Sequence, residues 1–238
     1  MKKLFSYFHP LTQLERARQA QLSNPALPEI IRELLSVPYP EPEAKLDELD
    51  FLVFDLETTG MNPEEDRILS IGYLNIHDFC VDIQTANHTY VKSNTEIKPE
   101  SAVINHIMPK MLMTGLLLDN AMENLFKAMK GKILIAHGTV IEKNFLDHYL
   151  NQRFGLEPLP LLWLDTLSME KSLIRNKSSN NTRDYRLAAV RKRHNLPPYL
   201  AHNALADSIA TGELFLVLVK IIFGKTTPTI GRLIKPVD

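Results

Sequence analysis

An apolar run that ends in two carboxylates constrains the fold of this chain more than any other stretch. Residues 51–54 (Phe-Leu-Val-Phe) are followed by Asp55-Leu-Glu57 and then by a Thr-Thr-Gly turn. Unbroken apolar character of this kind predicts a strand that is covered on both faces of a sheet. Because side chains alternate between the faces of a strand, Asp55 and Glu57 should project from the same side. Two acids that share a face at a buried strand end repel each other, and a divalent cation is the simplest compensation.

The composition fits a soluble domain with an appendage. The 238 residues are 45% hydrophobic, which is ample for a core. The formal net charge is −1, so a polyanionic partner must be held by local patches and metals instead of a global field. The single cysteine, Cys80, excludes an intramolecular disulfide and fits a reducing compartment. The start of the chain does not fit a signal peptide, and Lys220 interrupts the most apolar later stretch, so we expect a cytoplasmic protein without membrane association.

The first part of the chain is predicted to be a separate appendage. Apolar residues recur at helical spacing between 11 and 36, and Pro25 and Pro28 divide this stretch into two helices. Alternating prolines then predict an extended linker. We therefore expect a helical appendage and proline-rich linker at residues 1–45 and the main domain at 46–238. The helices are expected to pack on that domain; the alternative is a docking segment for a partner.

The remaining pattern predicts an α/β fold with a mixed sheet flanked by helices. The strand at 51–57 should begin an antiparallel meander, because the next two strand patterns follow it directly. Strands first and then alternating helices and strands are typical of a sheet that helices cover. Further strands are predicted at residues 66–76, 88–92, 132–137 and 161–167. Helices are predicted at residues 101–107, 117–129, 140–150, 185–194 and 203–223, with a polar loop at 176–183.

Two later groups of acidic and imidazole side chains lie where they can join the first pair. A predicted strand ends at His137, and Glu142 falls in the first turn of the helix that follows. His202 and Asp207 fall at the entry to the last long helix. Positions five residues apart do not share one face of a helix, so His202 must belong to the preceding loop if both are to reach one site.

Other conspicuous side chains have simpler interpretations. A histidine that follows a buried strand, as His137 does, is more often a hydrogen-bonded core or turn residue than a metal ligand. Asp165 and Thr166 are expected to form a hydrogen-bonded strand end. The basic residues between 183 and 194 are usual for a solvated helix face, although they could also follow the phosphates of a single nucleic-acid strand.

In this order and spacing, the three acidic groups resemble the motifs of the DEDDh exonucleases over about residues 50–222. That family includes the proofreading epsilon subunit of the bacterial replicative polymerase, ribonuclease T and oligoribonuclease. The resemblance implies a ribonuclease-H-like fold and metal-dependent removal of nucleotides from a 3′ end. It also implies that His202 is the general base and that two Mg²⁺ or Mn²⁺ ions are held by Asp55, Glu57, Glu142 and Asp207. Contacts to the substrate would come from Thr58, Thr59, Gly60, Asn105 and His106.

The implied chemistry agrees with elementary reasoning about phosphodiesters. Two cations offset the charge that resists attack on an anionic substrate, and an unperturbed imidazole accepts a proton near neutral pH. The chain departs from the family at Glu142, where an aspartate is usual, and at Asn105, where a histidine is frequent. Glutamate is one methylene longer but keeps the charge, so it could still bind a metal from a helix that is set further back.

Three functions remain open at this point. The first is a 3′–5′ exonuclease that acts on single-stranded or frayed DNA and releases nucleoside 5′-monophosphates. The second is an RNA-trimming exonuclease, which contacts to the 2′-hydroxyl would distinguish. The third is a non-catalytic nucleic-acid-binding or polymerase-associated module in which Glu142 disables one metal. The sequence after Asp207 is more similar to the polymerase-linked members, which favours DNA and makes a polymerase subunit a candidate partner. The oligomeric state is not indicated.

Overall fold

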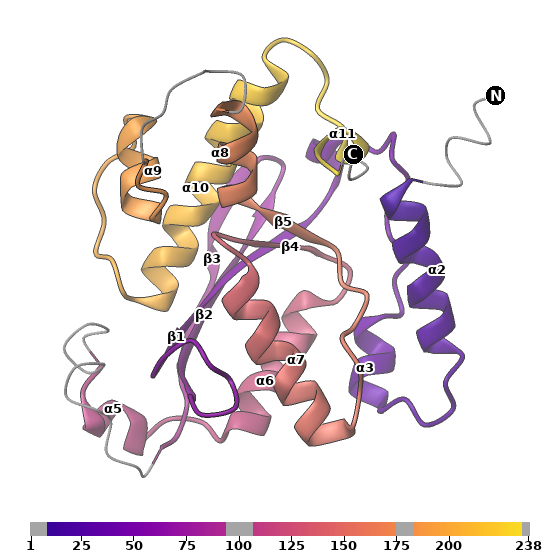
Figure 1. Ribbon diagram of the computed structural model, residues 1–238, viewed down its shortest axis with the longest axis vertical. Helices are drawn as coiled ribbons and strands as arrows, with labels where there is room; N and C mark the ends of the chain where they lie inside the picture. The colour runs from indigo at the N-terminus through magenta and orange to yellow at the C-terminus, as the bar shows by residue number, and fades with distance from the viewer. Residues whose placement is uncertain (1–8, 94–106, 175–182, 235–238) are drawn as a thin grey trace.

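The computed structural model describes residues 9–93, 107–174 and 183–234. Its centre is a five-stranded sheet in the order β3-β2-β1-β4-β5 (Figure 1). The strands β1, β2 and β3 are antiparallel neighbours, whereas β4 and β5 run parallel to β1. The predicted mixed sheet is therefore confirmed. The strand bounds are β1 Phe51–Thr58, β2 Ile68–His77, β3 Cys80–Tyr90, β4 Ile133–Ala136 and β5 Trp163–Asp165.

The alternation of side chains along β1 decides which face of the sheet carries the acids. Phe54 enters one apolar cluster, and Phe51 and Val53 enter another on the opposite face. Because the strand continues regularly, Asp55 and Glu57 share the face of Phe51 and Val53. The acid pair therefore lies on the face that the last long helix covers.

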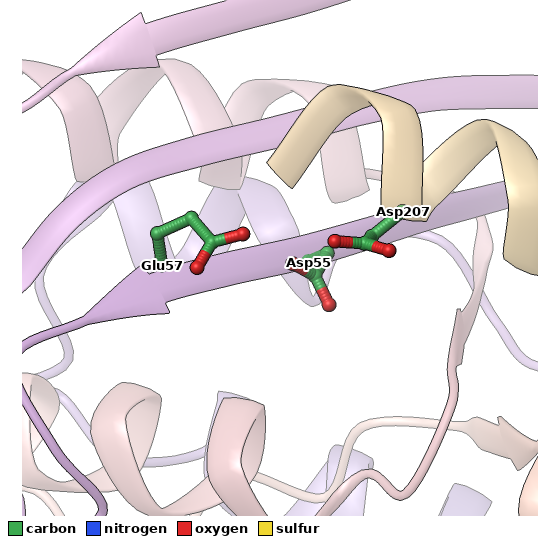
Figure 2. A group of neighbouring side chains, drawn as sticks. All are labelled: Asp55, Glu57 and Asp207. Carbon is green, nitrogen blue, oxygen red and sulfur yellow. The ribbon is translucent and has the colours of Figure 1, made fainter. Parts of the chain in front are cut away.

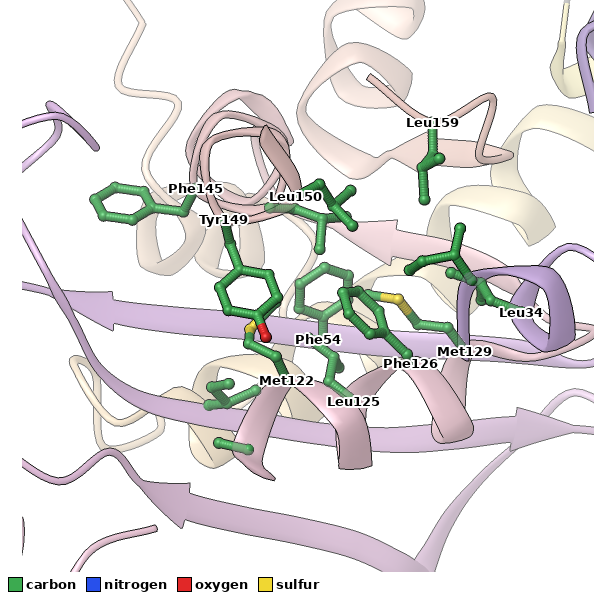
Figure 3. Packing of buried hydrophobic residues seen from close by; sticks show 14 of the residues in the cluster. Leu34, Phe54, Met122, Leu125, Phe126, Met129, Phe145, Tyr149, Leu150 and Leu159 are labelled. Atoms are coloured by element: carbon green, nitrogen blue, oxygen red, sulfur yellow. The ribbon is translucent and has the colours of Figure 1, made fainter. Parts of the chain in front are cut away.

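Helices cover both faces of the sheet (Figure 1). On the face of Phe54, the side chains of Leu125, Phe126 and Leu150 from two helices surround it (Figure 3). These helices are α6 Leu118–Met129 and α7 Val140–Phe154. The opposite face is covered by α10 Ala204–Phe223, against which α8 Thr166–Ile174 and α9 Leu187–Arg193 pack. Shorter helices are α5 Pro109–Met113, the 3₁₀ turn η1 Leu46–Glu48 and α11 Ile230–Leu233.

The N-terminal helices pack on the main domain, which is the arrangement that the sequence favours. They are α2 Pro10–Leu22 and α3 Glu29–Leu34. Ile31 of α3 joins the cluster beneath α6, and Leu11 of α2 joins the cluster beneath α10. In the connecting segment, the hydroxyl of Tyr39 donates a hydrogen bond to the carbonyl of Pro160. The helices thus share the core of the sheet, and a division of the chain at residue 45 stays a prediction.

Several elements differ from their predicted bounds. Helix α8 directly follows β5 and was not predicted, because Asp165 and Thr166 were interpreted only as a strand end. Strand β3 begins at Cys80 instead of residue 88, immediately after a turn in which Asp78 and Phe79 have positive φ angles of 49° and 55°. The predicted helix at 101–107 lies almost wholly outside the described residues. Within the described ranges, no helix is both long and apolar enough to cross a bilayer, and the cytoplasmic location stays a prediction.

Candidate active site

Three carboxylates from two elements meet at the end of β1. Asp55 and Glu57 project from β1, and Asp207 projects from the first turn of α10 (Figure 2). One oxygen from each of the three lies within 4.8 Å of the others, which makes the group able to hold a metal ion. The convergence of β1 and α10 that the sequence predicted is therefore present.

A glycine allows α10 to approach the sheet closely at this point. Gly72 of β2 pairs with Asp55 of β1. A Cβ atom at Gly72 would lie 2.2 Å from the backbone carbon of Ala204, so no other residue fits without displacing the helix. The hydroxyl of Ser208 also donates to the carbonyl of Gly72 at 2.9 Å. This contact brings Asp207 next to Asp55. Sequence reasoning missed Gly72, although a glycine inside a strand often marks close backbone approach.

The start of α10 also holds the Asp207 carboxylate. Asn203 is the N-cap, and its side chain accepts a hydrogen bond from the Ala206 amide at 3.0 Å. The backbone amide of Asn203 in turn donates to Oδ2 of Asp207 at 3.1 Å. The hydroxyl of Tyr199 also hydrogen-bonds to Asp207. These bonds favour the charged carboxylate, yet burial outweighs them and raises the pKa of Asp207.

His202 lies in the loop that precedes the helix, as the spacing required. It has a positive φ of 62° and an exposed side chain, and the helix begins two residues later at Ala204. Its imidazole lies close enough to Asp207 for its charge to oppose the rise in the pKa of that carboxylate. The side chain is therefore near Asp207 and open to solvent.

Glu142 is buried beside the other acids but outside the group of three. It lies in the first turn of α7 with 4% of its surface exposed. Its charge raises the pKa of Asp55, so the two carboxylates lie near each other. Its Oε2 atom has no hydrogen-bond partner among the residues that the structure describes. A buried carboxylate oxygen without a partner is costly, and a bound cation would satisfy it.

Burial and mutual repulsion raise the pKa values of these acids in the cation-free protein. Burial, with the charge of Asp207, raises the pKa of Glu57 to about 8. Burial, with the charge of Asp165, raises the pKa of Glu142 to about 8. Burial raises the pKa of Asp55 well above its ordinary value, and the charges of its acidic neighbours add to the rise. Several negative charges in one buried place are unfavourable by themselves, and a bound divalent cation would compensate them.

The Thr-Thr-Gly turn is held together by its own hydrogen bonds. The hydroxyl of Thr59 donates to Oδ1 of Asp66 at 2.8 Å and accepts from the Arg67 amide at 3.0 Å. The hydroxyl of Thr58 donates to the Gly60 carbonyl at 2.6 Å. The turn therefore has a defined shape next to Glu57. Contacts of Thr58, Thr59 and Gly60 with a substrate stay a prediction, and the other predicted contact residues, Asn105 and His106, lie outside the described residues.

His137 and Asp165 have the structural roles that the sequence favours. His137 bonds through Nε2 to the carbonyl of Tyr185 at 2.8 Å and through Nδ1 to the Thr166 hydroxyl at 2.9 Å. Asp165 accepts hydrogen bonds from the Gly138 amide at 2.8 Å and from an amide in the first turn of α8. These bonds tie the ends of β4 and β5 together beside the acids.

Part of the basic run supports the fold instead of facing a nucleic acid. Arg191 is 2% exposed and donates to the carbonyl of Ala210 and to the carboxylate of Glu213. Arg193 donates to the buried carboxylate of Glu170 at 3.1 Å. The interpretation that the run follows phosphates is therefore wrong for Arg191. The guanidinium of Arg193 is already hydrogen-bonded to Glu170.

A model of the exonuclease family, of the ribonuclease T type, matches residues 52–215, which include all the acids described above. This chain belongs to the exonuclease family. Within the family, it is 29% identical over 180 residues to the PolC-type DNA polymerase III of Thermotoga petrophila. The match covers 76% of this exonuclease chain and 12% of that polymerase, so the chain spans about an eighth of the PolC-type relatives. It is 27% identical over 199 residues to the DNA polymerase III subunit epsilon of Treponema pallidum, covering 79% of this chain and 88% of that subunit.

Solved structures show that the exonuclease chain has a ribonuclease-H-like fold. Escherichia coli exonuclease I in complex with a dA16 oligonucleotide superimposes with a TM-score of 0.58 at 20% identity, over 78% of this chain and 42% of that one. The cell-death related nuclease CRN-4 superimposes with a TM-score of 0.61 at 11% identity, over 76% and 66%. The predicted fold class is therefore confirmed.

Proposed function

We propose that this chain is a 3′–5′ exonuclease that removes nucleoside 5′-monophosphates from the 3′ end of single-stranded or frayed DNA. The observation that carries the proposal is the mutually repelling group of Asp55, Glu57 and Asp207, with the buried, unpartnered carboxylate oxygen of Glu142 nearby. Because the chain belongs to the exonuclease family, we assign this group of acids to the hydrolysis of nucleic acid.

The four carboxylates would hold two Mg²⁺ or Mn²⁺ ions. Such ions offset the negative charge on a phosphodiester and make a bound water more acidic. His202 would accept the proton of the attacking water, since its imidazole lies in the loop next to Asp207 and reaches solvent. The loop of Thr58, Thr59 and Gly60 would position the terminal sugar and phosphate, because its hydrogen bonds hold its shape beside Glu57.

Several comparisons favour DNA as the substrate. The relatives from Thermotoga and Treponema are named as DNA polymerase III and its epsilon subunit, and exonuclease I is described in complex with DNA oligonucleotides. A polymerase subunit is accordingly the partner that we propose. The choice between DNA and RNA depends on contacts to the 2′-hydroxyl of the last nucleotides, so matched oligonucleotides of the two kinds provide the test.

A degradation assay tests the proposal. A 5′-labelled DNA oligonucleotide should shorten stepwise with Mg²⁺ or Mn²⁺ and stay intact with EDTA, and the matched RNA should be a poorer substrate. Asp55→Asn and Asp207→Asn keep the shape of each side chain but remove its charge, and each should abolish shortening. Asp47→Asn, at an exposed position, is the matched control and should retain full activity. Full activity in either of the two site variants would refute the assignment.

A second candidate function rests on the position of Glu142. Because Glu142 is outside the group of three close carboxylates, the chain could bind nucleic acid with one metal and no turnover. This alternative predicts that the wild-type protein binds the oligonucleotide without cleaving it and that Glu142→Asp, which restores the usual family residue, produces cleavage. Cleavage by the wild-type protein would exclude it.

A further inference from the structure

Two buried polar atoms without partners belong to Glu142 and to the residue that pairs with Glu57. In native proteins nearly every buried polar atom is hydrogen-bonded, so each exception calls for an explanation. Glu142 is near enough to Asp55 to raise its pKa, and Ser70 of β2 is the register partner of Glu57. Within the part of the chain that the structure describes, the buried side-chain atoms without a partner are Ser70 Oγ, His88 Nε2, Glu142 Oε2 and Arg191 Nε. Two of the four thus lie beside a carboxylate of the proposed metal site.

The register places the Ser70 side chain beside that of Glu57. Residues that pair directly in an antiparallel sheet project from the same face, with Cβ atoms about 4.5–5.5 Å apart. Ser70 is completely buried, and Glu57 is 7% exposed. The register of β1 and β2 shifts immediately after this pair, between Glu57 and Thr58. Irregularities of this kind commonly re-aim a side chain next to an active site.

A hydroxyl at this position can donate to the carboxylate of Glu57, which is the polar side chain that pairs with it across the two strands. A carboxylate that gives one oxygen to a cation keeps several lone pairs, and a neighbouring hydroxyl can donate to one of them. Without such a bond, a buried hydroxyl lowers stability, and alanine would fit the same space. In the cation-free structure the Ser70 hydroxyl has no partner, so it stabilises the protein only if the Glu57 carboxylate turns toward it when a cation binds.

We propose that Ser70 is a positioning residue for Glu57, donating a hydrogen bond to its carboxylate in the cation-bound protein and holding it in the orientation that binds the metal. This inference rests on the proposed metal site. It assigns Ser70 no contact with substrate, so its effect should appear in metal binding before it appears in catalysis. Partners of this kind typically change metal affinity by 10–100-fold.

The test is Ser70→Ala, measured without a substrate. The urea midpoint in EDTA reports the cation-free protein, and the increase of that midpoint with Mn²⁺ concentration gives the metal affinity. We expect an unchanged or higher midpoint in EDTA and a Kd for Mn²⁺ about tenfold weaker than in the wild type. In DNA cleavage, the Mn²⁺ requirement should rise by a similar factor, with KM for DNA unchanged. Ser70→Thr keeps the hydroxyl and should recover most of the affinity.

Ser208→Ala is the matched control for the stability measurement. The Ser208 hydroxyl is also fully buried, but it already donates to the carbonyls of Gly72 and Ala204 at 2.9 and 2.8 Å, so its loss should lower the midpoint in EDTA. A lower EDTA midpoint for Ser70→Ala, or an unchanged Mn²⁺ affinity, would overturn the role of Ser70 alone. Absence of Mn²⁺ binding by the wild type would overturn the metal site and this inference with it.

Discussion

Replacing Glu57 by glutamine should stabilise the cation-free protein. Burial and the charge of Asp207 raise the pKa of Glu57 from 4.5 to about 8. Between these two values the folded protein holds a proton that the unfolded chain releases, so the unfolded state binds fewer protons. Stability must therefore fall as the pH rises through this window. Glutamine has nearly the same shape and does not titrate, so it removes the penalty.

The magnitude follows from the two pKa values. The penalty grows by about 1.4 kcal/mol for each pH unit above the unfolded value, which gives about 3 kcal/mol at pH 7 and less than about 1 kcal/mol at pH 5. Glu57→Gln should therefore raise the free energy of unfolding by about 3 kcal/mol at pH 7 and by a fraction of that at pH 5. The change in unfolding free energy at pH 7 minus the change at pH 5 is the more reliable quantity. Any effect of the altered side-chain shape is the same at both pH values and cancels in this difference.

Urea unfolding in EDTA at both pH values is the assay. Glu64→Gln, at an exposed position shortly after the Thr-Thr-Gly turn, is the control. It should not change the free energy of unfolding at either pH by more than about 0.5 kcal/mol. With saturating Mn²⁺ the order should reverse, because the variant has lost a ligand. A gain that is absent at pH 7, or equal at the two pH values, would refute the electrostatic account of this site.

Three further predictions concern the scaffold, proton release and the base. Gly72→Ala should lower the free energy of unfolding by about 3 kcal/mol, because the added Cβ would overlap the backbone of Ala204; an unchanged urea midpoint would contradict this. Mn²⁺ binding near pH 7 should release protons from Glu57 and Glu142, which calorimetry in two buffers can count; proton-neutral binding would contradict their raised pKa values. His202→Ala should reduce kcat about 10²–10⁴-fold with little change in Mn²⁺ affinity; an equal loss of both would make it a metal-site residue instead of the base.

Local patterns in the sequence predict the positions of the site residues well, because the local geometry of a strand or a helix end determines where these side chains point. Asp55 and Glu57 share a face since they continue the alternation of an apolar strand. His202 had to lie before the helix because positions five residues apart do not share one helix face, and Asn203 provides the N-cap that begins the helix there. These statements depend only on residues within a few positions of one another.

Features that depend on contacts between distant segments could not be predicted in this way. Gly72 is visible in the sequence as a glycine in a strand, but the helix backbone that it admits comes from residues near Ala204. Arg191 has the composition of a solvated basic face and is buried because α9 packs on α10. Ser70 is an ordinary strand residue until the register places it opposite Glu57. In each case a long-range contact decides the role, and one sequence carries no record of it.

The arrangement implies that the core holds the acids together against their own repulsion. Asp55 is attached to a strand that packs on both faces, and Asp207 is attached to a helix that cannot withdraw while Ser208 bonds to the carbonyl of Gly72. Changes at the acids and at this contact should therefore affect cation-free stability with opposite signs. If neutralising an acid and enlarging Gly72 both destabilised the protein, the acids would be part of what holds the fold together, and a cation would no longer be needed to explain their burial.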